Sequence, residues 1–141
     1  MPQLSSKVYA TFSREELLKG TDARNAFAVF DLMKSGKVVS RNLFDRTRNV
    51  ALPAPAIQAD WSGSAGTYTL SLQSAVLARH VYVSFGDHEA EVSDNYFDLL
   101  PGEAVTLQLK SKVDMEQLRR SLKIRNITDA FPRDSATQSE R

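Results

Sequence analysis

SDNYFDLLPGE, at residues 93–103, is the stretch from which the fold of this chain can be inferred. Pro101 presets φ for the second position of a turn, and Gly102 supplies the positive φ that the third position of a type II turn requires. Residues 104–110 then alternate apolar and polar side chains, as a half-buried strand does. We therefore predict a short edge segment, a corner pinned by local side-chain hydrogen bonds, and entry into a core strand.

Period-2 patterns recur along the rest of the chain. The clearest apolar face is formed by Tyr68, Leu70 and Leu72, and glycine-containing turns separate the patterns. The expected strands cover residues 7–12, 26–33, 38–44, 57–61, 67–72, 81–85, 104–110 and 123–127. Such strands, about 8–12 residues apart with turns between them, are typical of an antiparallel sandwich. The strand at 26–33 is apolar on both faces, so it is either central or lies against a neighbour outside the domain.

Two short helices are expected beside the strands. Ser13 and Glu16 have capping-box spacing, which predicts a single helical turn that ends at Gly20, with an irregular extended connection as the alternative. Asp114 is a good N-cap, and Gln117 stands three residues later, where a capping box requires it. The apolar face of that second helix comprises Met115, Leu118 and Leu122.

Whole-chain composition excludes several classes of protein. The 141 residues suffice for one ordinary domain but not for a (β/α)8 barrel, which needs about 250 residues. A formal net charge of +1 provides no field for steering nucleic acid or an anionic membrane. Without cysteine, the chain has neither disulfides nor thiolate metal sites. No apolar run approaches the ~18 residues of a membrane span, and no signal peptide is recognisable, so cytoplasmic and periplasmic locations both remain open.

The central stretch resembles the signature of the C-terminal immunoglobulin-like domain of glycoside hydrolase family 2 β-mannosidases. Other pieces of the chain are also similar and occur in compatible order, so the resemblance covers residues 27–131. They are GKVVSRNLF at 36–44, LP at 52–53, LARHVYVS at 77–84 and ITDAF at 127–131. We therefore predict an all-β, immunoglobulin-like antiparallel sandwich of about seven to eight strands with one short helix near the C-terminus. The sandwich is expected over residues 1–131, and a disordered tail over 132–141.

The resemblance also implies a function for the parent protein. Enzymes of this family hydrolyse terminal, non-reducing β-D-mannose residues with retention, and their catalytic acid and nucleophile lie in a barrel domain that this chain does not contain. The resemblance thus implies a non-catalytic accessory domain that packs on the other domains of the parent glycosidase. A loop of this domain at the rim of the mannoside pocket is a further expectation. Catalytic, cofactor-binding and metal-ligating residues are predicted to be none, and no cofactor is expected.

Two aspartates form the only tempting catalytic pair. Retaining glycosidases need two carboxylates about 5–5.5 Å apart in a rigid pocket. Asp94 and Asp98 stand four residues apart around a corner, where carboxylates commonly accept backbone N–H bonds. We predict the structural role for both.

Polar clusters are weak elsewhere. His80 and His88 are the only histidines, and His88 with Glu89 and Glu91 falls short of a convincing zinc-ligand set, so solvated loop charges are favoured. The basic residues near the second hairpin strand fit a solvated face or an acidic neighbouring domain better than nucleic acid, because nucleic-acid binding needs more charge on one face together with stacking aromatics. That basic run consists of Lys37, Arg41, Arg46 and Arg48.

Aromatic side chains are the candidates for sugar contact. Trp61 and Tyr68 flank one turn, but the inward register of both favours a core role. Tyr96 is expected to hold the corner through its hydroxyl, as tyrosine corners do in sandwich domains. Tyr82 and Phe97 complete the set.

Three functional hypotheses stand at this point. An accessory domain of a β-mannosidase is favoured. A free carbohydrate-binding module is the first alternative, and it requires coplanar exposed aromatic rings. An adhesion-type sandwich with a protein partner is the second.

Overall fold

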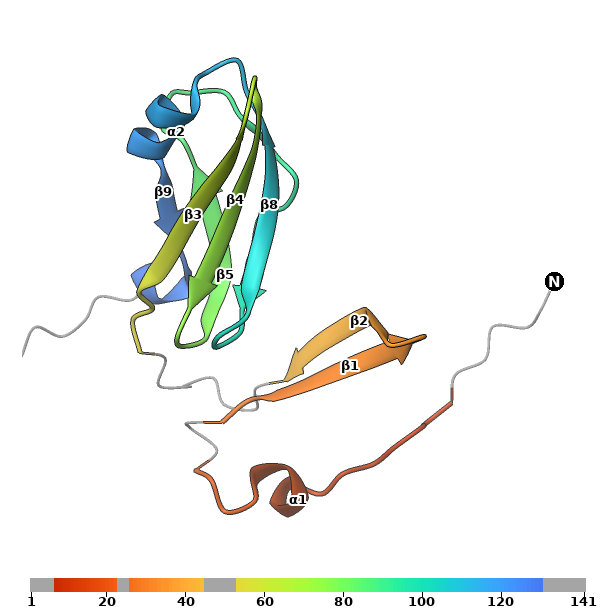
Figure 1. Cartoon of the computed structure of the whole chain (residues 1–141). Helices are drawn as coiled ribbons and strands as arrows, with labels where there is room; N and C mark the ends of the chain where they lie inside the picture. The colour runs from red at the N-terminus through yellow and green to blue at the C-terminus, as the bar shows by residue number, and fades with distance from the viewer. Residues whose placement is uncertain (1–6, 23–25, 45–52, 131–141) are drawn as a thin grey trace, which may run out of the picture. The chain divides into compact units, whose positions relative to one another are not determined.

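The computed structural model describes residues 7–22, 26–44 and 53–130. It divides into two compact units, residues 1–51 and 52–141 (Figure 1). The span 1–131, predicted as one domain, is therefore shared between the two units. The predicted tail at 132–141 lies outside the described residues, as do residues 45–52, which include Arg46 and Arg48.

The first unit contains a short helix and one hairpin. Helix α1 (Arg14–Leu18) begins at the predicted capping box, in which the Ser13 hydroxyl accepts a hydrogen bond from the Glu16 N–H and the Glu16 carboxylate accepts one from the Ser13 N–H. Strands β1 (Ala28–Lys34) and β2 (Lys37–Phe44) pair antiparallel around a turn with positive φ at Ser35 and Gly36.

The strand predicted at residues 7–12 is wrong. These residues are exposed and adopt no regular structure. Alternation makes a segment suitable for a sheet, but a strand also needs a partner whose N–H and C=O groups complete its hydrogen bonds. Strands β1 and β2 pair only with each other among the described residues, so no such partner is provided.

The second unit is the sandwich. Its first sheet has the order β3-β4-β8-β6, and its second has the order β7-β5-β9, with all pairs antiparallel. Figure 1 shows β3, β4 and β8 facing β5 and β9. The strands are β3 (Ile57–Ser64), β4 (Thr67–Ser74), β5 (Ala78–Ser84), β6 (Glu91–Val92), β7 (Phe97–Leu99), β8 (Ala104–Lys110) and β9 (Lys123–Arg125). The four-plus-three arrangement confirms the predicted all-β immunoglobulin-like sandwich.

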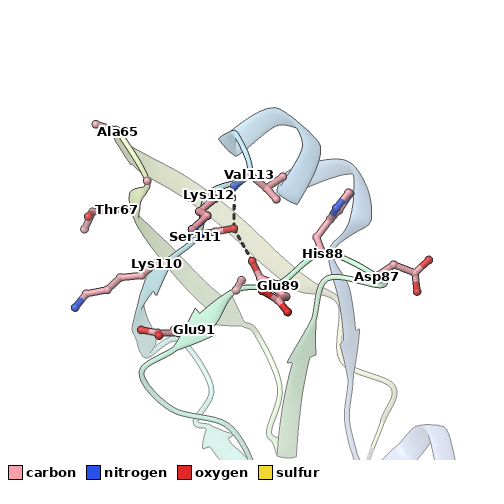
Figure 2. Close-up of a pocket in the computed structure, with 12 residues that line it drawn as sticks. Ala65, Thr67, Asp87, His88, Glu89, Glu91, Lys110, Ser111, Lys112 and Val113 are labelled. Atoms are coloured by element: carbon pink, nitrogen blue, oxygen red, sulfur yellow. Dashed lines mark hydrogen bonds between the residues drawn. The ribbon is translucent and has the colours of Figure 1, made fainter.

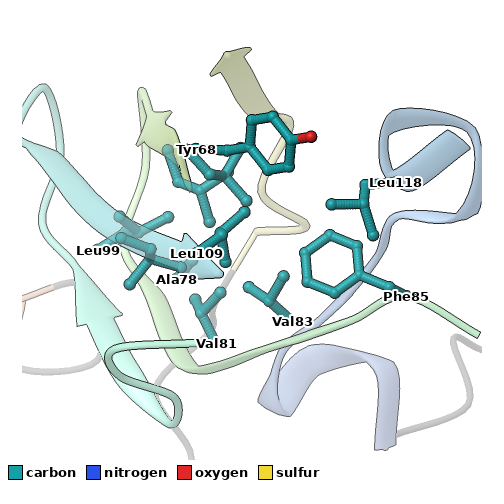
Figure 3. Close-up of a cluster of buried hydrophobic side chains, with 11 residues drawn as sticks. Tyr68, Ala78, Val81, Val83, Phe85, Leu99, Leu109 and Leu118 are labelled. Atoms are coloured by element: carbon teal, nitrogen blue, oxygen red, sulfur yellow. The ribbon is translucent and has the colours of Figure 1, made fainter. Parts of the chain in front are cut away.

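The core lies between these sheets, where the predicted inward positions meet (Figure 3). Leu70 and Leu72 of β4 are fully buried, opposite Val81 and Val83 of β5. The rest of the cluster comprises Tyr68, Ala78, Phe85, Leu99, Leu107, Leu109 and Leu118. Because successive side chains of a strand point to opposite faces, the period-2 pattern predicted the members of the cluster at residues 68–72, 81–85 and 104–110. Leu118 was expected from helical spacing, and Ala78 and Leu99 were not predicted.

Helix α2 (Met115–Ser121) closes one end of the core. The Asp114 carboxylate accepts a hydrogen bond from the Gln117 N–H at 2.9 Å, as the N-cap prediction requires. Leu118 is fully buried beside Phe85, whereas Met115 and Leu122 are half-buried. A 3-10 helix, η2 (Ile127–Ala130), ends the described chain. No helix of the described residues has the length and apolar character that crossing a membrane requires.

Candidate functional site

The central stretch carries the chain from one sheet to the other. The Ser93 hydroxyl accepts a hydrogen bond from the Gln108 N–H of β8, and the Ser93 N–H donates to the Gln108 carbonyl, both at 2.9 Å. Two residues later the contacts move to β5: the Val83 N–H donates to Asn95 Oδ1 at 2.7 Å, and Asn95 Nδ2 donates to the Val83 carbonyl at 3.1 Å. The Asn95 side chain therefore replaces a peptide group of a neighbouring strand.

The turn at the end of the stretch returns to the first sheet. Gly102 has φ of +76°, and the Glu103 N–H donates to the Leu100 carbonyl at 3.1 Å, as a type II turn requires. The Gly102 N–H donates to the Ser74 carbonyl, and Gln73 Nε2 donates to the Gly102 carbonyl. The predicted corner is confirmed, and its bonds join both sheets.

Both candidate aspartates are engaged in local contacts. Asp98 Oδ1 accepts the His80 N–H at 2.9 Å, and Asp98 Oδ2 lies 3.6 Å from Arg79 Nε. These contacts support the β5 bulge, where His80 has φ of +51°. Asp94 Oδ1 accepts the Asn95 N–H at 2.8 Å. The geometry agrees with the structural role predicted for the pair.

Tyr96 does not occupy the position expected for a tyrosine corner. Its side chain is 68% exposed, and its backbone provides the anchor, because the Tyr96 N–H donates to the Val81 carbonyl at 2.8 Å. The hydroxyl that ties a connection to the sandwich belongs to Tyr68, which is buried and donates to the Val113 carbonyl at 3.1 Å. A positive φ of 61° at Tyr96 directs this ring outward, and nothing in the sequence around it signals that conformation.

An aromatic pair therefore lies outside the core. The Tyr96 ring packs against Tyr82 of β5, with centroids 5.1 Å apart and planes at 31°. Tyr82 lies directly opposite Arg125 in the pairing of β5 with β9, so the exposed Arg125 shares this face. No pattern in the sequence predicted that these three residues, which are far apart in the chain, would lie on one face.

The other aromatic candidates are structural. Trp61 is half-buried and packs edge-on against Phe85 at 6.0 Å between centroids. Phe97 is half-buried against the core. The small platform considered for Trp61 and Tyr68 is therefore part of the interior.

A polar hollow of about 980 Å³ lies at one end of the sandwich (Figure 2). Ser111 organises it, because its hydroxyl donates to the Glu89 carbonyl at 2.6 Å and accepts the Val113 N–H at 3.1 Å. His88, Glu89 and Glu91 line it but are all exposed. Within the described ranges, no group of three histidine or acidic residues is arranged to hold a metal ion.

The basic run is only partly described. Arg41 of β2 donates two hydrogen bonds to the Asp31 carboxylate across the hairpin, at 2.6 and 2.8 Å. Lys37 opens β2, and Arg46 and Arg48 lie outside the described residues. Because Arg41 is paired with Asp31, part of the positive charge that would attract an acidic partner is neutralised within the hairpin.

The sandwich seen here matches a family model for an Ig-fold domain of mannosidases over residues 52–130. The chain belongs to the mannosidase Ig-fold domain family. The matched range coincides with the second unit of the structure, so the Ig-fold domain is the sandwich itself and the α1–hairpin unit precedes it. No curated protein matches the chain.

A solved structure of a much longer chain has a similar fold. The β-D-mannosidase of Dictyoglomus thermophilum matches with a TM-score of 0.66 at 19% sequence identity, which shows similarity of fold. The match covers 78% of this chain and 14% of the mannosidase chain, so this chain spans about a seventh of that enzyme's length. Residues 52–141 alone make up less than that share of the chain, so the match extends into the first unit.

Proposed function

We propose that this chain is a non-catalytic accessory module of a β-mannosidase that hydrolyses terminal, non-reducing β-D-mannose residues. The observation that carries the proposal is the state of the first unit. None of its described residues is buried, although the sandwich beside it in sequence has a complete core. A unit of this kind needs other polypeptide to cover it.

The apolar faces of the hairpin are the surface that we infer to be covered. A two-stranded hairpin alone is marginally stable in water, because it cannot bury enough apolar area. Both faces of this hairpin carry exposed apolar side chains, and Phe12 packs on Phe30 at 6.2 Å between centroids. The exposed apolar set is Phe30, Leu32, Met33, Val38, Val39 and Phe44.

A hollow of about 260 Å³ continues this surface within the first unit. It lies between helix α1 and the base of the hairpin, and it is lined mainly by apolar side chains such as Phe12, Leu17 and Phe44. Contiguous exposed apolar surface marks sites of protein contact. The match to a mannosidase that extends into this unit supports a catalytic domain of the same enzyme as the covering partner.

Catalysis is assigned to that other domain. A retaining mechanism needs a carboxylate free to attack and an acid free to donate a proton. In this chain the Asp94 and Asp98 carboxylates accept backbone N–H groups, and Asp98 also lies near Arg79. Their hydrogen bonds serve the corner rather than a substrate.

Activity of the purified chain on an aryl β-mannoside tests the non-catalytic role. We expect no turnover above buffer, because the acid and nucleophile reside elsewhere. Turnover that rises with the amount of purified chain, and that is lost in an Asp94→Asn or Asp98→Asn variant, would overturn the proposal.

Hydrogen exchange tests the accessory role. We expect the amides of β1 and β2 to exchange rapidly in this chain alone and to be protected in the full-length enzyme, because the covering domain is then present. The amides of β4 serve as the control, since the sandwich core is complete in both samples. Equal exchange of the hairpin in both samples would contradict the interdomain surface.

A further inference from the structure

We propose that Tyr96, backed by Tyr82, is a stacking site for the apolar face of a pyranose ring. The site lies on the outer face of the β7-β5-β9 sheet, within the second unit. It is independent of the accessory role: failure to bind sugar would remove this site and leave that role in place.

The Tyr96 ring is presented rigidly. The Tyr96 N–H donates a hydrogen bond to the Val81 carbonyl, and the preceding Asn95 forms two hydrogen bonds with Val83. These hydrogen bonds restrain the backbone at residues 95 and 96. The Tyr82 ring then supports one side of Tyr96 at 5.1 Å between centroids. Two rings that limit each other's rotation lose little conformational freedom when a ligand arrives, which favours binding.

Backbone strain supports a role for the exposed ring. Tyr96 has φ of +61°, a region that glycine enters freely and that a bulky residue enters at a cost. Burial does not offset this cost, since 68% of the residue is exposed. The hydrogen bonds to β5 hold the residue in this conformation, and backbone strain that the surrounding structure maintains often occurs at functional positions.

The chemistry of the site fits a pyranose ring. A β-linked mannoside carries three axial hydrogens on one face of its ring, and this apolar patch matches the flat face of a tyrosine. The ring hydroxyls point outward from the patch and need hydrogen-bond partners at the edge of the site. Arg125, directly opposite Tyr82, provides N–H donors there.

The arrangement favours one sugar unit rather than a long chain. The two rings are tilted by 31° and pack on each other, so they do not form the coplanar row that successive sugar units of a polysaccharide require. A single aromatic face with a flanking arginine predicts weak, millimolar binding with modest selectivity among pyranosides that share the axial-hydrogen face.

Two-dimensional 1H–15N NMR of the whole chain tests the site. Methyl β-D-mannopyranoside is titrated to tens of millimolar, with glycerol at equal concentration as the reference for nonspecific effects. We expect saturable shifts centred on the amides of Tyr82, Tyr96 and Arg125, and the same pattern with β-1,4-mannobiose. Absence of saturable shifts, or shifts centred on His88 and Ser111 in the polar hollow, would overturn the proposal.

Tyr96→Gly is the decisive variant, because glycine accepts the positive φ and the fold is retained. We expect its binding to weaken about tenfold or more while its melting temperature is unchanged or higher. Tyr82→Leu keeps an apolar residue on β5 and should weaken binding less. Tyr9→Ala removes a tyrosine that is 89% exposed in the first unit and should leave the affinity unchanged. Wild-type affinity in Tyr96→Gly, or equal loss in Tyr9→Ala, would overturn the assignment.

Discussion

At the scale of single residues, the Asn95 side chain joins the central stretch to β5 by two hydrogen bonds. It follows the Ser93 contacts with β8 and provides both an acceptor and a donor to Val83 of β5. An amide is the one uncharged side chain type that offers a donor and an acceptor in the geometry of a peptide group. The change of sheet at this point therefore depends on a side chain that behaves as backbone.

Asn95→Ala should lower the free energy of unfolding by about 2 kcal/mol, because it leaves the N–H and C=O of the buried Val83 without these partners. Urea unfolding followed by the fluorescence of Trp61, the single tryptophan, would measure it. Asn95→Asp keeps the acceptor, but only a protonated carboxyl can still donate to the Val83 carbonyl, so we expect a smaller loss of stability at pH 4 than at pH 7. A change below about 0.5 kcal/mol for Asn95→Ala would contradict this account.

Two glycines with positive φ allow the cost of backbone strain to be measured separately from the cost of steric crowding by a Cβ atom. A Cβ on Gly102 would meet open space, whereas one on Gly63 would lie 2.5 Å from the Thr67 carbonyl oxygen. We expect Gly102→Ala to cost about 1 kcal/mol from backbone strain alone. Gly63→Ala should cost about 2 kcal/mol or more, because the β3–β4 hairpin must also shift. Thermal unfolding of both variants measures the difference, and equal losses would show that crowding at Gly63 is relieved without cost.

At the scale of elements, the ion pair between Arg41 and Asp31 joins the two strands of the β1–β2 hairpin. The two hydrogen bonds from Arg41 lower the pKa of Asp31 below its ordinary value of 3.8. A group with a lowered pKa in the folded state contributes stability above its unfolded pKa and loses that contribution as pH falls through the folded value. The hairpin should therefore weaken below about pH 4.

An NMR pH titration of the Asp31 side chain in the whole chain would check this expectation. The carboxyl should titrate below its ordinary range, and the Arg41→Gln variant should restore an ordinary value because the charged donors are gone. Glu16 is an internal comparison: its pKa is also lowered, by hydrogen bonds from the backbone and side chain of Ser13, and should not respond to Arg41→Gln. An ordinary Asp31 pKa in the unmodified chain would refute the pairing.

The stability of helix α2 comes from burial of its apolar side chain rather than from the length of the helix. Seven residues are too few for an isolated helix in water, so its stability must come from Leu118 and from the Asp114 cap. Leu118→Ala should lower the unfolding free energy by about 2–5 kcal/mol, while the exposed neighbour Arg119→Ala should change it by less than about 0.5 kcal/mol. Chemical denaturation followed by Trp61 fluorescence would rank the two, and similar values would place Leu118 outside the cooperative core.

At the scale of the whole molecule, the two units differ in what holds them together. The sandwich has a continuous buried cluster between its sheets, whereas no described residue of the first unit is buried. We therefore expect amides in β4, β5 and β8 to exchange only through global unfolding, and amides in β1 and β2 to exchange orders of magnitude faster. Protection of the hairpin equal to that of β4 in this chain alone would show that the first unit has a core of its own.

Much of the sandwich was predictable from local rules. The faces of β4 and β5, the type II turn at Gly102 and the Asp114 cap depend on residue spacing or on one backbone angle, and the structure confirms each. The prediction of a strand at residues 7–12 was wrong because a strand needs a hydrogen-bonding partner, and tertiary structure decides whether one is available. The prediction that the Tyr96 hydroxyl holds the corner was wrong for a related reason. The outward position of its ring results from hydrogen bonds to β5, which lies more than ten residues earlier in the chain.

The amino-acid sequence by itself determined the strand periodicity, the turns and the helix cap, because each reflects the φ preference or side-chain period of neighbouring residues. The tertiary structure decided which sheet each strand joined, which tyrosine was buried and which was exposed, and that no described residue of the first unit was buried. Those outcomes depend on hydrogen bonds and packing between residues that are distant in sequence, and local preferences do not specify them.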